Sequence, residues 1–122
     1  MTTSTEAPRL AVEPIGVERW RITNQGVVSV RLFETWLPHG RFRGESTRHD
    51  RVIGSGESVT LDLRVRTSGA PGETVENAFL ILRLDGWRVL ARLAVRFDSK
   101  ARPHPEVVML TSQRSGFSGV EE

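Results

Sequence analysis

The stretch NAFLILRLDGWRVLARLAVRF, residues 77–97, decides the fold, because it holds two strand-like apolar runs around one turn signal. In the second run, apolar side chains occupy every other position from Trp87 to Phe97. A period of two places alternate side chains on opposite faces of a strand. The dipeptide Asp85-Gly86 between the runs is a strong hairpin signal. The stretch therefore predicts two antiparallel strands joined by a tight turn.

The same alternation recurs along most of the chain, with Gly and Pro between the runs. In residues 58–66, for example, Val59, Leu61, Leu63 and Val65 alternate with polar side chains. No comparable stretch has helical spacing with caps. The expected strands are residues 10–15, 18–24, 27–36, 51–54, 58–66, 75–84 and 87–97. Short strands separated by turn signals indicate an all-β sandwich or barrel.

The parity of the alternation also predicts a core. One face of each strand carries the larger apolar side chains, and these faces should meet. The residues expected to be buried together are Trp20, Ile22, Leu61, Leu63, Leu80, Leu82, Val89, Ala91 and Leu93.

The composition limits the classes of function. A chain of 122 residues is long enough for one domain with a core. It has no cysteine, which excludes disulfides, thiolate metal sites and cysteine nucleophiles. Residues 1–14 lack the basic and apolar segments of a secretory signal, and no apolar run approaches the roughly 20 residues of a membrane helix. We therefore expect a cytoplasmic protein that does not associate with membranes.

Two turn motifs carry a resemblance to known families. Residues 22–30, ITNQGVVSV, end one strand in Asn-x-Gly, and residues 53–63, IGSGESVTLDL, enter another through Gly-Glu-Ser. The pair resembles bacterial immunoglobulin-like domains of the cell-adhesion-related and abnormal-spindle/hydin type. In those families the second motif begins with proline, and Ser55 stands in its place here.

The resemblance spans roughly residues 10–97 and implies an immunoglobulin-like antiparallel β-sandwich of about seven strands that works by binding. It implies no catalytic residues and names no ligand. We expect a flexible N-terminus over residues 1–9 and a C-terminal tail over residues 98–122. Within the tail, the apolar run of residues 107–110 could dock on the domain or on a partner.

No catalytic or metal-binding constellation stands out in the sequence. His39, His49 and His104 lack the close spacing of metal ligands, although the first two could approach each other across a loop. Residues 54–56, Gly-Ser-Gly, lack the Lys-Ser/Thr of a phosphate-binding loop and precede a strand. No nucleophile-elbow pattern occurs. We therefore expect a protein that is not an enzyme, with no bound metal and no cofactor.

Glu34 is a carboxylate in the middle of an expected strand, among apolar side chains. A buried carboxylate can be functional. The more common explanation is a bulge, an edge position, or pairing with an arginine such as Arg31 or Arg83. We expect one of these.

The stretch WLPHGRFRG, residues 36–44, begins an arginine-rich segment that we expect to be a loop over residues 37–51. Four arginines near two aromatic side chains are typical of a surface that binds single-stranded nucleic acid. Glu45 and Asp50 interrupt the cluster, and the formal net charge of the chain is only +2. Nucleic-acid or polyanion binding through the arginine-rich loop of residues 41–51 is therefore the alternative function. Its residues would be Trp36, His39, Arg41, Phe42 and Arg43.

The simpler interpretation of the same stretch is a structured corner. Pro38 and Gly40 favour a turn. Trp36 shares the parity of Leu32, so we expect it to cover one end of the core, with Phe42 folded beneath the loop.

Residues 77–84 break the alternation, because both faces of this strand are apolar. Such a strand needs cover on both faces. On the face away from the core, the neighbouring strands add further apolar and basic side chains. The predicted protein-binding residues are Phe33, Phe79, Ile81, Arg83, Leu90 and Arg92, with Arg31, Arg88 and Arg96 around them.

An apolar centre with arginine around it is typical of a protein–protein interface. The competing explanation is that residues 107–110 or the N-terminal segment cover this face. We therefore predict a non-enzymatic module that binds another protein through this face. The favoured partner is a second copy of itself, which would give a homodimer, and nucleic acid is the less favoured partner.

Overall fold

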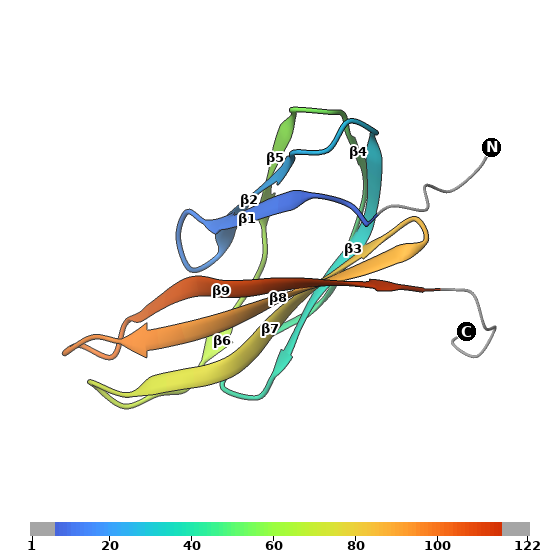
Figure 1. Cartoon of the computed structure of the whole chain (residues 1–122). Helices are drawn as coiled ribbons and strands as arrows, with labels where there is room; N and C mark the ends of the chain where they lie inside the picture. The colour runs from blue at the N-terminus through green and yellow to red at the C-terminus, as the bar shows by residue number, and fades with distance from the viewer. Residues whose placement is uncertain (1–6, 116–122) are drawn as a thin grey trace.

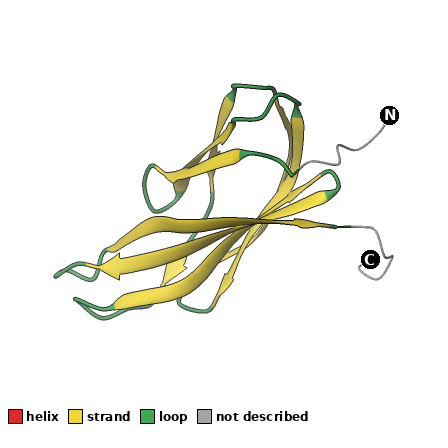
Figure 2. Ribbon diagram, viewed as in Figure 1, coloured by secondary structure: helices red, strands yellow, loops and turns green. Residues whose placement is uncertain are grey.

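The computed structural model describes residues 7–115, and its regular structure there is entirely β-strand (Figures 1 and 2). The strands are β1 (Leu10–Pro14), β2 (Arg19–Asn24), β3 (Val30–His39), β4 (Phe42–Ile53), β5 (Ser58–Asp62), β6 (Arg66–Thr67), β7 (Thr74–Leu84), β8 (Trp87–Phe97) and β9 (Pro103–Arg114). Over the described range, no helix is long and apolar enough to cross a membrane. The expected flexible N-terminus lies outside the described residues except for residues 7–9.

The strands form two antiparallel sheets in a sandwich-like arrangement (Figure 1). The smaller sheet has the order β1-β2-β5, and the larger has the order β6-β4-β3-β7-β8-β9. Every pairing within them is antiparallel. The predicted all-β class and the two-layer sandwich are therefore confirmed at this level.

The predicted hairpin of residues 77–97 is confirmed as β7 and β8. The two strands pair from Thr74↔Arg96 to Leu84↔Trp87, and Gly86 has a φ of 80° in the turn. Glycine adopts this left-handed conformation without a Cβ clash. Because both strands are long and in register, their inward side chains form a continuous buried surface in the middle of the larger sheet.

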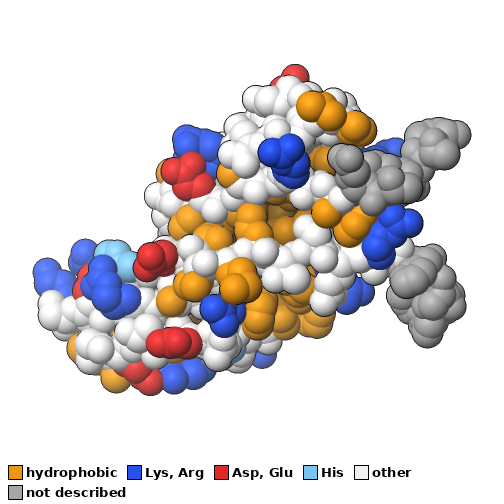
Figure 3. All heavy atoms as spheres, viewed as in Figure 1, with side chains coloured by type: hydrophobic (Ala, Val, Ile, Leu, Met, Phe, Trp, Pro, Cys, Tyr) orange, Lys and Arg blue, Asp and Glu red, His pale blue; other side chains and the backbone are white. Residues whose placement is uncertain are grey.

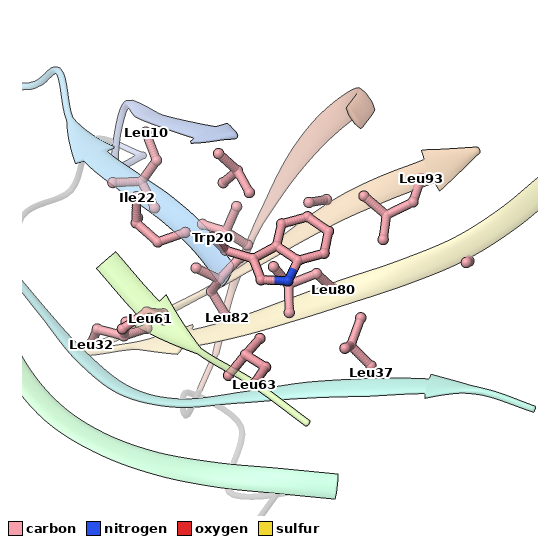
Figure 4. Close-up of a cluster of buried hydrophobic side chains, with 14 of the residues drawn as sticks. Leu10, Trp20, Ile22, Leu32, Leu37, Leu61, Leu63, Leu80, Leu82 and Leu93 are labelled. Atoms are coloured by element: carbon pink, nitrogen blue, oxygen red, sulfur yellow. The ribbon is translucent and has the colours of Figure 1, made fainter. Parts of the chain in front are cut away.

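The predicted core is confirmed, since all nine residues named for it are buried. Trp20 enters from β2 and lies over Leu80 and Leu82 of the larger sheet (Figure 4). Its ring meets Phe42 of β4 edge to face, with 6.5 Å between ring centroids and 70° between planes. Such pairs add to the stabilisation from burial alone. The two sheets are thus joined through one aromatic contact as well as through aliphatic packing.

Asn24 organises the connection between the sheets. Its side-chain amide donates to the carbonyls of Val28 and Ile53, at 2.9 Å each, and its Oδ1 accepts from the Gly26 amide at 2.9 Å. A buried amide bonded in this way satisfies backbone groups that the crossing would leave unpaired. The expected strand of residues 27–36 therefore begins only at Val30, and Val28 is exposed in the connection.

The predicted single strand of residues 58–66 is wrong, because the chain changes sheets there. β5 pairs with β2 in the smaller sheet, whereas β6 pairs with β4 in the larger. Between them, the amides of Leu63 and Val65 bond to the backbone and side-chain oxygens of Glu18, at 2.8 and 3.0 Å. The apolar alternation continues through the crossing, so the sequence shows no break.

The predicted loop over residues 37–51 is also wrong, because most of it is the long strand β4. β3 and β4 form a hairpin that turns at Gly40 and Arg41. Phe42 and Gly44 face the core, and the residues from Glu45 to Val52 are exposed or half-buried. A strand with so few apolar side chains gives no alternation signal.

The predicted tail is wrong for residues 103–114, which form the edge strand β9 beside β8. The last part of the predicted tail, residues 116–122, lies outside the described range. Pro103 and Pro105 are compatible with an edge position, where one side of the strand makes no ladder. Val107 and Leu110 pack against the core, while a bulge opposite Arg92 and Leu93 interrupts the period. The half-exposed face and the bulge together hide the strand in the sequence.

Truncation of Trp20 should measure the coupling between the sheets. Trp20→Ala is expected to lower the free energy of unfolding by about 3–5 kcal/mol, the range for removing a large core side chain. Trp20→Phe should cost clearly less, because it keeps most of the ring and removes an indole N–H that is buried without a partner in the described structure. Chemical denaturation of the three proteins checks this. A near-neutral Trp20→Ala would contradict the core.

The turn before β9 should respond to acid. The His104 imidazole and the amides of Arg102 and Lys100 donate to the Asp98 carboxylate and lower its pKa from 3.8 to about 2. A folded pKa below the unfolded one means that this contribution is complete above about pH 4 and is lost as the pH falls toward 2. A carboxyl NMR titration of Asp98 should show the low pKa, and His104→Ala should raise it. An Asp98 pKa near 3.8 would contradict the hydrogen bonds described for this turn.

Candidate interaction face

The face of the larger sheet that points away from the core carries a row of large side chains. Trp36 of β3 is opposite Ile81 of β7, Ile81 is opposite Leu90 of β8, and Leu90 is opposite Thr111 of β9. Side chains directly opposite on neighbouring strands are in contact range. Four strands therefore contribute to one continuous row, which we call the outer-face row.

A second row runs beside it. Phe79 is opposite Arg92, which is opposite Met109. Phe33, Phe79, Ile81, Leu90 and Arg92 are half-buried. Trp36 and Met109 are 48% and 51% exposed, so they bound the patch on either side. The structure thus places the predicted residues Phe33, Phe79, Ile81, Arg83, Leu90 and Arg92 on one face.

Trp36 is on this face because of a bulge in β3, so its predicted place over the core is wrong. Between Leu32 and Glu34, β3 advances by two residues while its partner β7 advances by only one. A bulge inserts one residue and inverts the parity that follows. Thr35 and Leu37 therefore point inward and Trp36 points outward. The bulge expected at Glu34 is present, but sequence parity cannot show where it begins.

Phe33, at the bulge in β3, is held between two cations. The guanidinium groups of Arg31 and Arg83 lie 5.5 and 5.3 Å from its ring centroid, within the range of a cation–π contact. Asp50 bonds Arg31 at 3.0 Å and Glu34 bonds Arg83 at 3.3 Å. The pairing expected for Glu34 is thus with Arg83. Two carboxylates thus hold two arginines around one aromatic ring.

Glu34 is also bonded from β4. The Ser46 hydroxyl donates to its second oxygen, and this bond, followed by that from Arg83, lowers the pKa of Glu34 below its usual value despite partial desolvation. The carboxylate therefore stays charged at neutral pH and keeps Arg83 in place. Its role here is to orient Arg83.

The other arginines of this face remain available. Arg88, Arg92 and Arg96 make no side-chain hydrogen bond, ion pair or ring contact within residues 7–115. Arg88 lies directly opposite Arg83, which places like charges side by side. Among the carboxylates, Glu106 is exposed opposite Ala94. The face is thus apolar at its centre and has an excess of unpaired positive charge at its rim.

No described residue packs over this face. β9 extends the sheet sideways, and Val107 and Leu110 of the apolar run point to the core side. The expectation that residues 107–110 might cover the face is therefore wrong. Val108 and Met109 are each about half exposed, and hydrophobic side chains are visible along β9 and between β9 and the smaller sheet (Figure 3).

The alternative site does not come together in the structure. Phe42 is in the core, Trp36 is on the outer face, and Arg41 bonds the Glu73 carboxylate at 2.5 Å and the Ser68 carbonyl at 3.0 Å. The ion pair and the Ala70 amide lower the pKa of Glu73. His39 accepts a bond from the Arg41 amide within the turn. Trp36, His39, Arg41, Phe42 and Arg43 therefore have separate roles.

The histidines are also separate. His49 shares a 2.8 Å bond with the Thr35 hydroxyl, and burial, with the nearby charge of Arg51, lowers its pKa. His104 bonds Asp98 in the turn before β9. Within the described residues, no three His, Cys, Asp or Glu side chains converge as a metal site would need.

The sequence did not reveal a cleft between β4 and the crossing from β5 to β6. It has a volume of about 450 Å³ and is lined by Arg43, Gly44, Glu45, Ser46, Thr47, Asp62, Arg64 and Arg66. In the sequence, Arg64 and Arg66 occupy polar positions of the single strand predicted over residues 58–66. Only the change of sheet brings them beside Arg43.

Searches against family models, curated proteins and solved structures find no match to this chain.

Proposed function

We propose that this chain is a non-enzymatic protein-binding module of immunoglobulin-like fold, which holds a partner protein on the outer face of its larger sheet. The observation that carries the proposal is the outer-face row, in which Trp36, Ile81 and Leu90 align across three strands with no described residue over them. A strand that is apolar on both faces needs cover on both.

The order of the strands supports the immunoglobulin-like assignment. β1-β2-β5 corresponds to strands A-B-E of such a sandwich, and β4-β3-β7-β8 corresponds to C′-C-F-G. β9 then extends the second sheet beyond strand G. The turn motifs that resemble the cell-adhesion-related and abnormal-spindle/hydin domains lie in residues 22–30 and 53–63 of this framework.

The charge of the face favours a different protein over a second copy. Two copies joined through this face would bring two sets of unpaired arginines, Arg88, Arg92 and Arg96, into one interface, and like charges disfavour association. A partner with an apolar centre and carboxylates around it matches both features. Burial of one large apolar side chain contributes about 1.5–3 kcal/mol. A few such side chains reach the roughly 8 kcal/mol of a micromolar complex.

Nucleic-acid binding through the arginine-rich segment is less well supported. That function needs aromatic side chains beside the cations. Phe42 is buried, and Arg41 is committed to an ion pair with Glu73.

A photo-crosslinker at Trp36 tests the proposal. Replacing the indole with benzoylphenylalanine keeps an aromatic side chain at the exposed position, and the protein is then irradiated in extract of its source cells. We expect a discrete adduct with one partner protein. The double change Ile81→Glu and Leu90→Glu should abolish it, because two carboxylates would then stand at the apolar centre of the contact. Thermal melting should show that the variant remains folded.

Two controls make the result specific. Thr60→Glu with Gln25→Glu adds the same charge at exposed positions away from the larger sheet and should leave the adduct intact. The crosslinker at Val27, which is 86% exposed elsewhere, should give no such adduct. An adduct that persists in the Ile81 and Leu90 variant, or that forms equally from Val27, would rule out the outer face. An adduct of two copies of the chain would show self-association instead.

A further inference from the structure

The change of sheet between β5 and β6 leaves most of one edge of β4 open. β6 pairs with β4 only at Phe42 and Arg43. From Gly44 onward, no described strand pairs with β4 on that side, because the chain has crossed to the smaller sheet. An open edge presents unpaired N–H and C=O groups in the spacing of a ladder.

The cleft described above lies at the start of this open edge. Its volume of about 450 Å³ separates residues 43–47 of β4 from Asp62, Arg64 and Arg66. The crossing is held in place on its other side by the two bonds from Leu63 and Val65 to Glu18. A Cβ at residue 44 would lie 2.6 Å from the Arg64 carbonyl oxygen, so glycine allows the two segments to meet at the base of the cleft.

The charges in the cleft are unbalanced. Arg43, Arg64 and Arg66 are exposed, and none makes a side-chain hydrogen bond or ion pair within the described part of the chain. Asp62 is already bonded to Arg19 at 2.9 Å. Glu45 is then the one lining carboxylate without an ion pair among the described residues. Three unpaired guanidinium groups thus face one unpaired carboxylate.

We propose that this cleft binds an extended acidic peptide segment, which adds as a strand to the open edge of β4 while its carboxylates bond Arg43, Arg64 and Arg66. Strand addition takes its affinity from backbone bonds and its specificity from the alternate side chains. Arginine presents donors in a fork that matches a carboxylate. The site is separate from the outer face, and neither proposal depends on the other.

A nucleic acid fits the same surface less well. Single-stranded nucleic acids are held by aromatic stacking as well as by cations. The residues that line the cleft include no aromatic side chain. A peptide backbone, in contrast, can use both the cations and the open ladder.

Fluorescence anisotropy with three labelled probes of equal charge tests the proposal. The probes are a peptide of alternating glutamate and valine, the same peptide with every backbone amide N-methylated, and oligothymidylate. We expect only the first to bind saturably, because an N-methylated amide cannot donate to a ladder on either edge of the strand. Changing Arg43, Arg64 and Arg66 to Gln should weaken its binding by about tenfold or more. Changing Arg9, Arg96 and Arg102 to Gln removes the same charge elsewhere and should have little effect.

Amide NMR of the unaltered protein gives a second readout that needs no variant. Addition of the glutamate–valine peptide should shift the resonances of residues 44–47 and 63–66 most strongly. The proposal is overturned if that peptide does not bind, if the N-methylated peptide or oligothymidylate binds as well, if both arginine triples weaken binding equally, or if the shifts centre elsewhere. Ile81→Glu with Leu90→Glu should leave this binding unchanged, which separates it from the outer-face function.

Discussion

The packing of Trp20 against Phe42 and the aliphatic side chains around them joins the two sheets. Trp20 comes from the smaller sheet and Phe42 from the larger, and both are fully buried. Once these side chains point inward, the period of two in β7 and β8 fixes which residues point outward. Ile81 and Leu90 are therefore on the outer face as a consequence of core packing, since their chain neighbours Leu82 and Val89 are in the core.

The sequence predicts the parts of the fold that have long, uninterrupted alternation. β8 and the core around Trp20 follow from parity, whereas β7 and the outward position of Ile81 follow from the hairpin that joins β7 to β8. Prediction from the sequence fails where a bulge or a polar stretch interrupts the alternation of apolar and polar side chains. The bulge in β3 moves Trp36 outward, and β4 gives no signal because Phe42 and Gly44 are its inward residues before a polar stretch. Where a bulge falls depends on the pairing of the strand with residues that are distant in the sequence.

The two proposed surfaces differ in how far the sequence could reveal them. The outer face combines side chains from strands whose pairing the hairpin signal already suggests, so Phe79, Ile81 and Leu90 could be grouped beforehand. The cleft depends on the change of sheet after Asp62, which places Arg64 and Arg66 beside Arg43. Both surfaces have excess positive charge and unpaired arginines, which favours acidic partners at each.

The proposed function requires that the chain itself does not cover the outer face of the larger sheet. Methyl NOE spectroscopy of the isolated protein tests this most directly, with Ile81 and Leu90 as probes. If the face is open, these methyl groups should show contacts only to their neighbours in the sheet, such as Trp36, Phe79 and Thr111. Contacts from residues 1–6 or 116–122 to the same methyl groups would contradict the proposed function, because the face would then be covered by the chain's own termini.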